Sequence, residues 1–250
     1  MSGHSKWSTI KRKKEKTDSA RGRVFTRLIK ELTVAARHGG GDPEANPRLR
    51  TALLAAKASN MPADNIKKAI QRGTGELPGV NYEEVQYEAY GPGGAALLMQ
   101  VLTDNRNRTV SELRNVLSKN GGNMGEAGCV NWMFHKRGLI EIDAAKAPED
   151  QVLEIALDAG AADMTAEGAT YSIVTSVDVF EAVKAALEKN KIPVASAEVT
   201  MVPQSSVRLD GKEAEQMLRL MDALEEHDDI QHVYANFDID DAVIERYSSS

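Results

Sequence analysis

The residues best suited to chemistry in this chain are the lysines and arginines crowded into its first thirty positions, MSGHSKWSTIKRKKEKTDSARGRVFTRLIK. Ammonium and guanidinium groups at this density attract a polyanion, because each can pair with a phosphate and release the counterions held there. Over the whole chain, 31 Lys and Arg stand against 37 Asp and Glu, a net charge of -6. The basic segment therefore belongs to a protein that is acidic overall.

The charges are segregated along the sequence. Residues 1–72 contain 17 basic and 6 acidic side chains, a net charge of +11, whereas the remaining 178 residues hold 14 basic and 31 acidic side chains, a net charge of -17. This asymmetry predicts a basic module for a polyanion, joined to an acidic body, but does not identify the polyanion. The expected phosphate contacts are Lys6, Lys11, Arg12, Lys13, Lys14, Lys16, Arg21, Arg23, Arg27 and Lys30.

A secondary candidate is the stretch TDNRNRT, which places Arg106 and Arg108 between a predicted buried strand and the start of a predicted helix. Arginine side chains and helix N-termini both favour phosphate. Alternatively, Asp104 or Asn107 caps the helix and the arginines pair with local acids. The sequence supports the two interpretations equally.

The remaining reactive residue types form no catalytic or metal-binding pattern. The five histidines are scattered, and only His227 and His232 lie loosely near each other, so we predict no metal site. Residues 91–94, GPGG, lack the Lys-Ser/Thr ending of a P-loop and indicate a hairpin turn. We expect no enzyme activity, no cofactor and no small-molecule substrate.

The composition predicts a soluble cytoplasmic protein. The single Cys129 excludes an internal disulfide and is interpreted as a small packed side chain. No run approaches the roughly 20 apolar residues of a membrane helix, and the N-terminus lacks the apolar core of a secretory signal. A mitochondrial presequence is a weaker alternative, because Glu15 and Asp18 interrupt the basic run.

Three short helices are predicted for the N-terminal part, after an arm without hydrophobic period over residues 1–16. The first helix runs from Thr17 or Asp18 to the glycines at 39–41, and places Arg23, Arg27, Lys30 and Arg37 away from its apolar stripe. The second begins at Asn46-Pro47, and the third begins at Met61-Pro62 and ends at Gly73.

Strands and helices alternate after residue 81. A strand–turn–strand hairpin and a helix are expected over 82–122, further strand material over 129–143, and then helix, strand, helix and strand up to residue 203. A helix over 212–227 and a strand over 230–239 end the series. This order predicts two α+β sandwiches with antiparallel sheets. It leaves open whether the last helix and strand complete the third unit or fold back onto the second.

The acidic stretch LEEHDDIQHV is expected to be solvated surface, or alternatively to mask the basic arm.

Four motifs resemble those of the YebC family, bacterial relatives of the mitochondrial translational activator of cytochrome c oxidase: GHSKWSTIKRKKEKTDSARGRVFTRLIKEL, MPADNIKKAIQRGTG, YEAYGPGGAALLMQVLTDNRNRT and GGNMGEAGCVNWMFHKRG. The sequence departs from the family's pattern at Ala89 and Cys129, which are packing-scale changes. The resemblance implies a helical domain over 1–75, an α+β domain over 80–134 plus 206–240, and a third α+β domain over 135–205 inserted in the second.

Two functions are compatible with the resemblance. The first is a DNA-binding transcriptional regulator whose basic arm and helical face contact duplex phosphates; the absence of a convincing helix-turn-helix argues against base-edge reading. The alternative is a ribosome-associated translation factor that binds rRNA through the same basic surface, where Trp7 could stack on an unpaired base. Either partner is a nucleic acid, and no membrane partner is expected.

Overall fold

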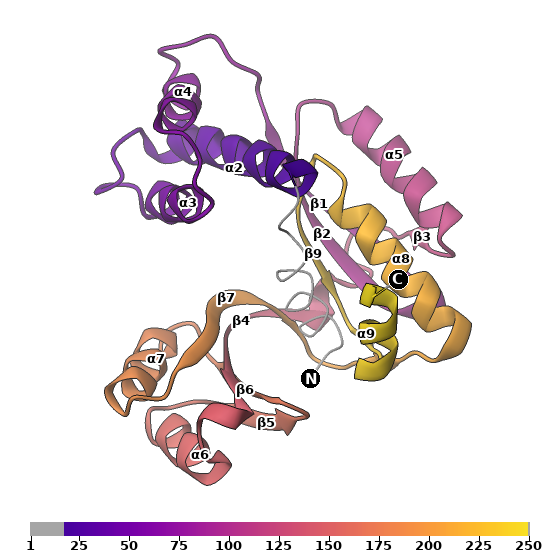
Figure 1. The fold of residues 1–250 in the computed structure, drawn as a ribbon. Coiled ribbons are helices and arrows are strands. Elements are labelled where there is room, and N and C mark those ends of the chain that lie inside the picture. Colours follow the sequence, from indigo (N-terminus) through magenta and orange to yellow (C-terminus); the bar gives the residue numbers. More distant parts are fainter. Residues whose placement is uncertain (1–17, 250) are drawn as a thin grey trace.

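The computed structural model describes residues 18–249, and its N-terminal part is a bundle of three helices (Figure 1). They are α2 (Asp18–Gly39), α3 (Pro47–Ala58) and α4 (Ala63–Thr74). Asn46 caps α3, because its side-chain oxygen accepts the Leu49 N–H at 3.1 Å. The three predicted helices are confirmed.

The helices of this bundle enclose a small apolar core of their own, which includes Leu32, Leu49 and Ile66. Gly73 lets α4 approach α2 closely, since a Cβ at this position would lie 2.4 Å from the carbonyl oxygen of Thr33. A side chain larger than hydrogen would force the two helices apart. Gly73 therefore sets the distance between two helices, whereas the third helix, expected to end at Gly73, ends at Thr74 and is capped by Gly75.

The second unit is a four-stranded sheet of order β3-β1-β2-β9 with helices α5 and α8 packed on it. The expected hairpin is present, with Tyr90 opposite Ala96 and the turn closed by a hydrogen bond from Gly91 N–H to Ala95 O. The last helix and strand return to this sheet, because β9 pairs antiparallel with β2. The elements are β1 (Glu83–Tyr90), β2 (Ala96–Thr103), α5 (Arg106–Lys119), β3 (Asn123–Met124), α8 (Gly211–Glu225) and β9 (Ile230–Ala235).

The third unit is an antiparallel sheet of order β5-β6-β4-β7 covered by two helices. The long strands β4 and β7 join it to the rest of the molecule (Figure 1). It is inserted between β3 and α8 of the second unit, so the α+β class and the inserted third domain are confirmed. Its elements are β4 (Phe134–Asp143), α6 (Glu149–Asp158), β5 (Asp163–Glu167), β6 (Thr170–Thr175), α7 (Phe180–Lys189) and β7 (Val194–Pro203).

Several elements differ from expectation. Strand β5, helix α9 (Asp241–Ser249) and strand β8 (Val207–Arg208) are not among the expected elements. The strand expected over 230–239 is divided into β9 and β10 (Phe237–Asp238), and β10 pairs parallel with β8. The strand expected from residue 129 begins only at Phe134, after a 3-10 turn at Asn131–Met133. The backbone before that turn is held by a side chain of β1 instead of by a neighbouring strand, as described below.

Candidate nucleic-acid interface

The predicted phosphate contacts divide into two groups. Lys6, Lys11, Arg12, Lys13, Lys14 and Lys16 lie outside the described residues and stay predictions. The structure places the other six on two elements, with Arg21, Arg23, Arg27 and Lys30 on α2 and Arg106 and Arg108 in the first turn of α5.

Lys30 faces the interior of the protein. It is 7% exposed, and its Nζ donates to Asp229 Oδ1 at 2.6 Å and to the carbonyl of Asp228 at 2.9 Å. A buried ammonium needs such a partner, because removal from water disfavours the charge. In this arrangement Lys30 has no free charge to offer a phosphate, which corrects the expectation that it contacts nucleic acid.

Asp229 connects α2 to α5, because it binds Lys30 of the first helix and Arg108 of the second. Its second oxygen, Oδ2, accepts hydrogen bonds from Arg108 Nη2 at 2.8 Å and from Thr109 Oγ1 at 2.7 Å. Burial alone would raise the pKa of Asp229, but the hydrogen bonds from Lys30, Thr109 and Arg108 outweigh it and hold the pKa well below its usual range. The carboxylate therefore stays ionised at neutral pH and links the N-terminal helix to the second unit.

Arg106 and Arg108 pair with acidic side chains, which is the second of the two interpretations that the sequence left open. Arg106 Nε lies 2.8 Å from Glu83 Oε2, and Arg108 pairs with Asp104 at 2.8 Å as well as with Asp229. The cap of α5 is Asn105, whose Oδ1 accepts the N–H of Arg108 at 3.0 Å. Both arginines are occupied by local acids, and the capping residue is neither Asp104 nor Asn107.

The basic side of α2 meets the acidic end of α8. Arg27 donates to the carbonyl of Glu225, and Arg23 Nη2 lies 3.5 Å from Glu226 Oε1. The acidic stretch therefore contacts the helix that follows the arm, whereas any contact with the arm itself lies outside the described residues. Arg23 keeps about a third of its side chain exposed, and Arg21 is exposed near the start of α2.

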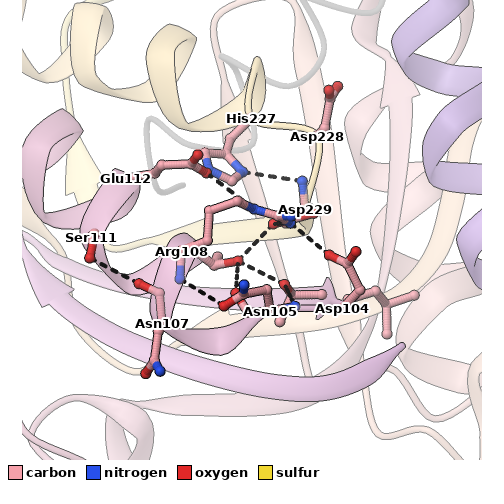
Figure 2. Close-up of polar contacts among 12 residues, drawn as sticks. Asp104, Asn105, Asn107, Arg108, Ser111, Glu112, His227, Asp228 and Asp229 are labelled. Carbon is pink, nitrogen blue, oxygen red and sulfur yellow. Dashed lines mark hydrogen bonds and ion pairs between the residues drawn. The ribbon is translucent and has the colours of Figure 1, made fainter. Parts of the chain in front are cut away.

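A group of possible metal ligands lies between α5 and the acidic stretch LEEHDDIQHV, with Glu112 from α5 and with His227 and Asp229 from the stretch. His227 is already engaged on both ring nitrogens, since Nε2 lies 3.0 Å from Glu112 Oε2 and Nδ1 accepts the Asp229 N–H at 3.1 Å (Figure 2). The cations of Lys30 and Arg108 neutralise Asp229 and would repel a metal ion. These contacts favour a structural role for the group.

The N-terminal bundle exposes other basic residues that are not among the predicted phosphate contacts. Lys57 on α3 and Lys67 and Lys68 on α4 are exposed, and within residues 18–249 no ion pair involves them. Arg72 is exposed one helical turn after Lys68. The sequence contains a signal for the cations of α4, because IKKAIQR places Lys67 and Lys68 between the buried Ile66 and Ala69, and Arg72 after them. Accessible positive charge thus lies on α3 and α4 more than on the middle of α2.

Comparison with known proteins covers nearly the whole chain. Residues 5–76 match the model of the TACO1/YebC protein N-terminal domain, and residues 82–237 match that of the TACO1/YebC second and third domain. A "Probable transcriptional regulatory protein" of Desulforapulum autotrophicum is 58% identical over 97% of this chain and 98% of its own length. A protein with the same description from Syntrophobacter fumaroxidans is 58% identical over 98% of this chain and 99% of its own.

The crystal structure of a conserved hypothetical protein from Aquifex aeolicus is similar to this one. It has a TM-score of 0.75 and 46% sequence identity, over 90% of this chain and 93% of that chain. Separately, none of the helices in the described part of the chain is long and apolar enough to cross a membrane.

Proposed function

Because the chain belongs to the TACO1/YebC family, we propose that it is a cytoplasmic nucleic-acid-binding regulator that acts on DNA in transcription and catalyses no reaction. The observation that carries the proposal is the charge segregation, +11 in residues 1–72 against -17 in the rest. A polyanion is attracted to the first part and repelled by the second, so the molecule has a preferred side for nucleic acid. The name shared by its relatives supports the regulatory role.

Binding is through phosphates rather than through base edges. The arm supplies Lys6, Lys11, Arg12, Lys13, Lys14 and Lys16, and the start of α2 adds Arg21 and Arg23. The lysines of α3 and α4 extend this surface. Helix α2 is not free to enter a major groove along its basic side, because Arg27 and Lys30 hold that side against the second unit. Selection among sequences would then come from DNA shape or from a partner protein.

Reversal of charge in the arm tests this function. Lys11→Glu/Lys13→Glu/Lys14→Glu should abolish binding of a labelled 20-base-pair DNA in fluorescence anisotropy, while the melting temperature stays within about 2 °C of wild type, as for surface substitutions in general. The matched control reverses three exposed lysines of the acidic body, Lys119, Lys189 and Lys212. Full affinity in the arm variant would remove the arm from the mechanism.

A second candidate function is translation, with rRNA bound at the ribosome by the same basic surface. The observation that favours it is the exposed Trp132, which precedes three exposed basic residues in β4. Co-sedimentation from cell lysate separates the two candidates. Ribosome association that survives DNase treatment and is lost in the arm variant would favour translation, whereas absence from the ribosomal fractions would favour transcription.

A further inference from the structure

Trp132 is an unusual surface residue. Its side chain is 64% exposed, more than that of any other large hydrophobic residue among those described. The indole N–H donates to the carbonyl of Cys129 at 3.1 Å, so the polar atom of the ring is already satisfied within the protein. A large aromatic ring left in water costs free energy, and such rings are concentrated at binding surfaces.

The loop that carries Trp132 is held in one shape by a buried carboxylate. Glu88 of β1 is 8% exposed and accepts backbone N–H bonds from Gly128 at 2.6 Å, Val130 at 2.6 Å and Asn131 at 2.8 Å. Burial opposes ionisation, but these three bonds outweigh it and lower the pKa of Glu88. An ionised side chain is thus removed from water in order to fix a surface loop.

Apolar anchors on both sides of Trp132 reinforce this loop. Val130 and Phe134 are buried in a cluster with Leu98 of β2 and Tyr234 of β9. The side chain of Asn131 accepts a hydrogen bond from Gln86 at 2.8 Å. Trp132 is therefore presented from a fixed backbone, which reduces the entropy lost when a partner binds.

Basic residues follow Trp132 along the chain, in the first half of β4. His135, Lys136 and Arg137 are exposed in β4, and within the described part of the chain none of them forms an ion pair. Their neighbours across the ladder in β7 are the uncharged Val202, Met201 and Thr200. In a body of net charge -17, with histidines counted as neutral, the adjacent cations of Lys136 and Arg137 are a local exception. At about 3.3 Å per residue, the three basic residues begin within roughly 10 Å of Trp132 along the chain.

We propose that Trp132 stacks on an unpaired base while basic side chains of β4 contact the phosphates beside it, with His135 and Arg137 on one face of the strand and Lys136 on the other. This contact gives the protein a preference for unpaired nucleotides over a duplex, because the faces of paired bases are already covered by their neighbours. The positive charges select a polyanionic strand rather than a neutral peptide. The inference rests on the proposed nucleic-acid binding and adds a second contact, outside the arm and the N-terminal bundle.

Tryptophan fluorescence tests the stacking directly. The chain has two tryptophans, so Trp7→Phe leaves Trp132 as the single reporter. The probes are a 20-nucleotide single-stranded RNA of mixed sequence, the DNA of the same sequence, and the blunt 20-base-pair DNA duplex. We expect both single strands to quench the fluorescence of Trp132 at saturation, and the duplex to leave it largely unchanged.

Affinity measurements on the full chain supply the second readout. Trp132→Ala should weaken binding of the single strands by roughly 5- to 150-fold, the range for loss of one stacked base, with little change for the duplex. Leu157→Ala is the matched control, because Leu157 on α6 is 48% exposed and lies outside the N-terminal bundle that carries the basic surface. Lys136→Ala/Arg137→Ala should weaken single-strand binding and reduce its salt dependence.

The outcomes separate this inference from the proposed function. If Trp132→Ala binds single strands as tightly as Leu157→Ala does, while the arm variant loses binding, the stacking contact is wrong and the proposed function stands. If the wild-type chain binds none of the three probes at 50 mM KCl, both are wrong. Quenching by poly-L-glutamate as strong as that by RNA would also overturn the inference, since it would show a response to charge without stacking.

Discussion

Removal of the Asp229 carboxylate is expected to destabilise the junction between α2 and the second unit. Asp229→Ala leaves the ammonium of Lys30, whose side chain is 9% exposed, without its anionic partner at 2.6 Å. Removal of one member of a buried ion pair costs about 3–5 kcal/mol, because the other charge stays buried. We expect the lower end, about 3 kcal/mol, since Lys30 keeps the Asp228 carbonyl and Arg108 keeps Asp104.

Urea unfolding followed by circular dichroism measures this loss. With an m-value of about 3 kcal/mol per molar, a loss of about 3 kcal/mol lowers the urea midpoint by about 1 M. A double-mutant cycle with Lys30→Met isolates the pair. Asp229→Ala should cost clearly less in the Lys30→Met background, because no buried ammonium is then left unpaired.

The pH dependence gives an independent check. Since the pKa of Asp229 is lowered in the folded protein, its contribution to stability is complete above the ordinary value of about 3.9 and is lost as the pH falls below it. The wild-type urea midpoint should therefore fall more steeply than that of Asp229→Ala below about pH 4. Equal midpoints for the two proteins at pH 7, or equal costs of Asp229→Ala in both backgrounds of the cycle, would refute the assignment of the junction to this pair.

Two further predictions concern the positioning of the nucleic-acid surfaces. Glu88→Gln should lower the free energy of unfolding by about 1–3 kcal/mol, because an amide cannot accept all three N–H groups of the loop. It should also lower the fluorescence anisotropy of Trp132 in the Trp7→Phe background. Unchanged anisotropy would show that Glu88 does not hold the loop. Gly73→Ala should lower the stability of the N-terminal bundle by about 1–3 kcal/mol, because the new Cβ meets the carbonyl of Thr33. Gly75→Ser serves as a backbone-strain control, because Gly75 has a φ of 85° and open space around it. Equal stability of Gly73→Ala and wild type in urea would contradict the close approach of the two helices.

Local features of the fold could be predicted from the sequence because their causes are local. The cap at Asn46, the glycine stop at residues 39–41 and the turn at residues 91–94 each depend on neighbouring residues, and each is present. Strand β5 was not predicted because DMTAE, although polar and apolar residues alternate in it, is only five residues long and contains Asp, Ala and Glu, which are depleted in strands. Its pairing with β6 identifies it as a strand.

The site was predicted less well because its determinants are distant in sequence. Lys30 and Asp229 are separated by 199 positions, so nothing near Lys30 indicates that its charge is neutralised inside the protein. From composition alone, Lys30 is therefore grouped with the accessible cations. Likewise, the three N–H bonds accepted by Glu88 join β1 to a loop about forty residues later, and no local pattern reveals them.

The most direct test of nucleic-acid binding through the basic surface is a salt titration of affinity with the full chain and the 20-base-pair duplex. Contact with six to ten phosphates predicts that the logarithm of the binding constant falls with the logarithm of KCl concentration at a slope of roughly -5 to -9. A structured RNA of similar size should give a slope of similar steepness. Absence of binding to both nucleic acids at 50 mM KCl, or an affinity that salt leaves unchanged, would contradict the proposed function.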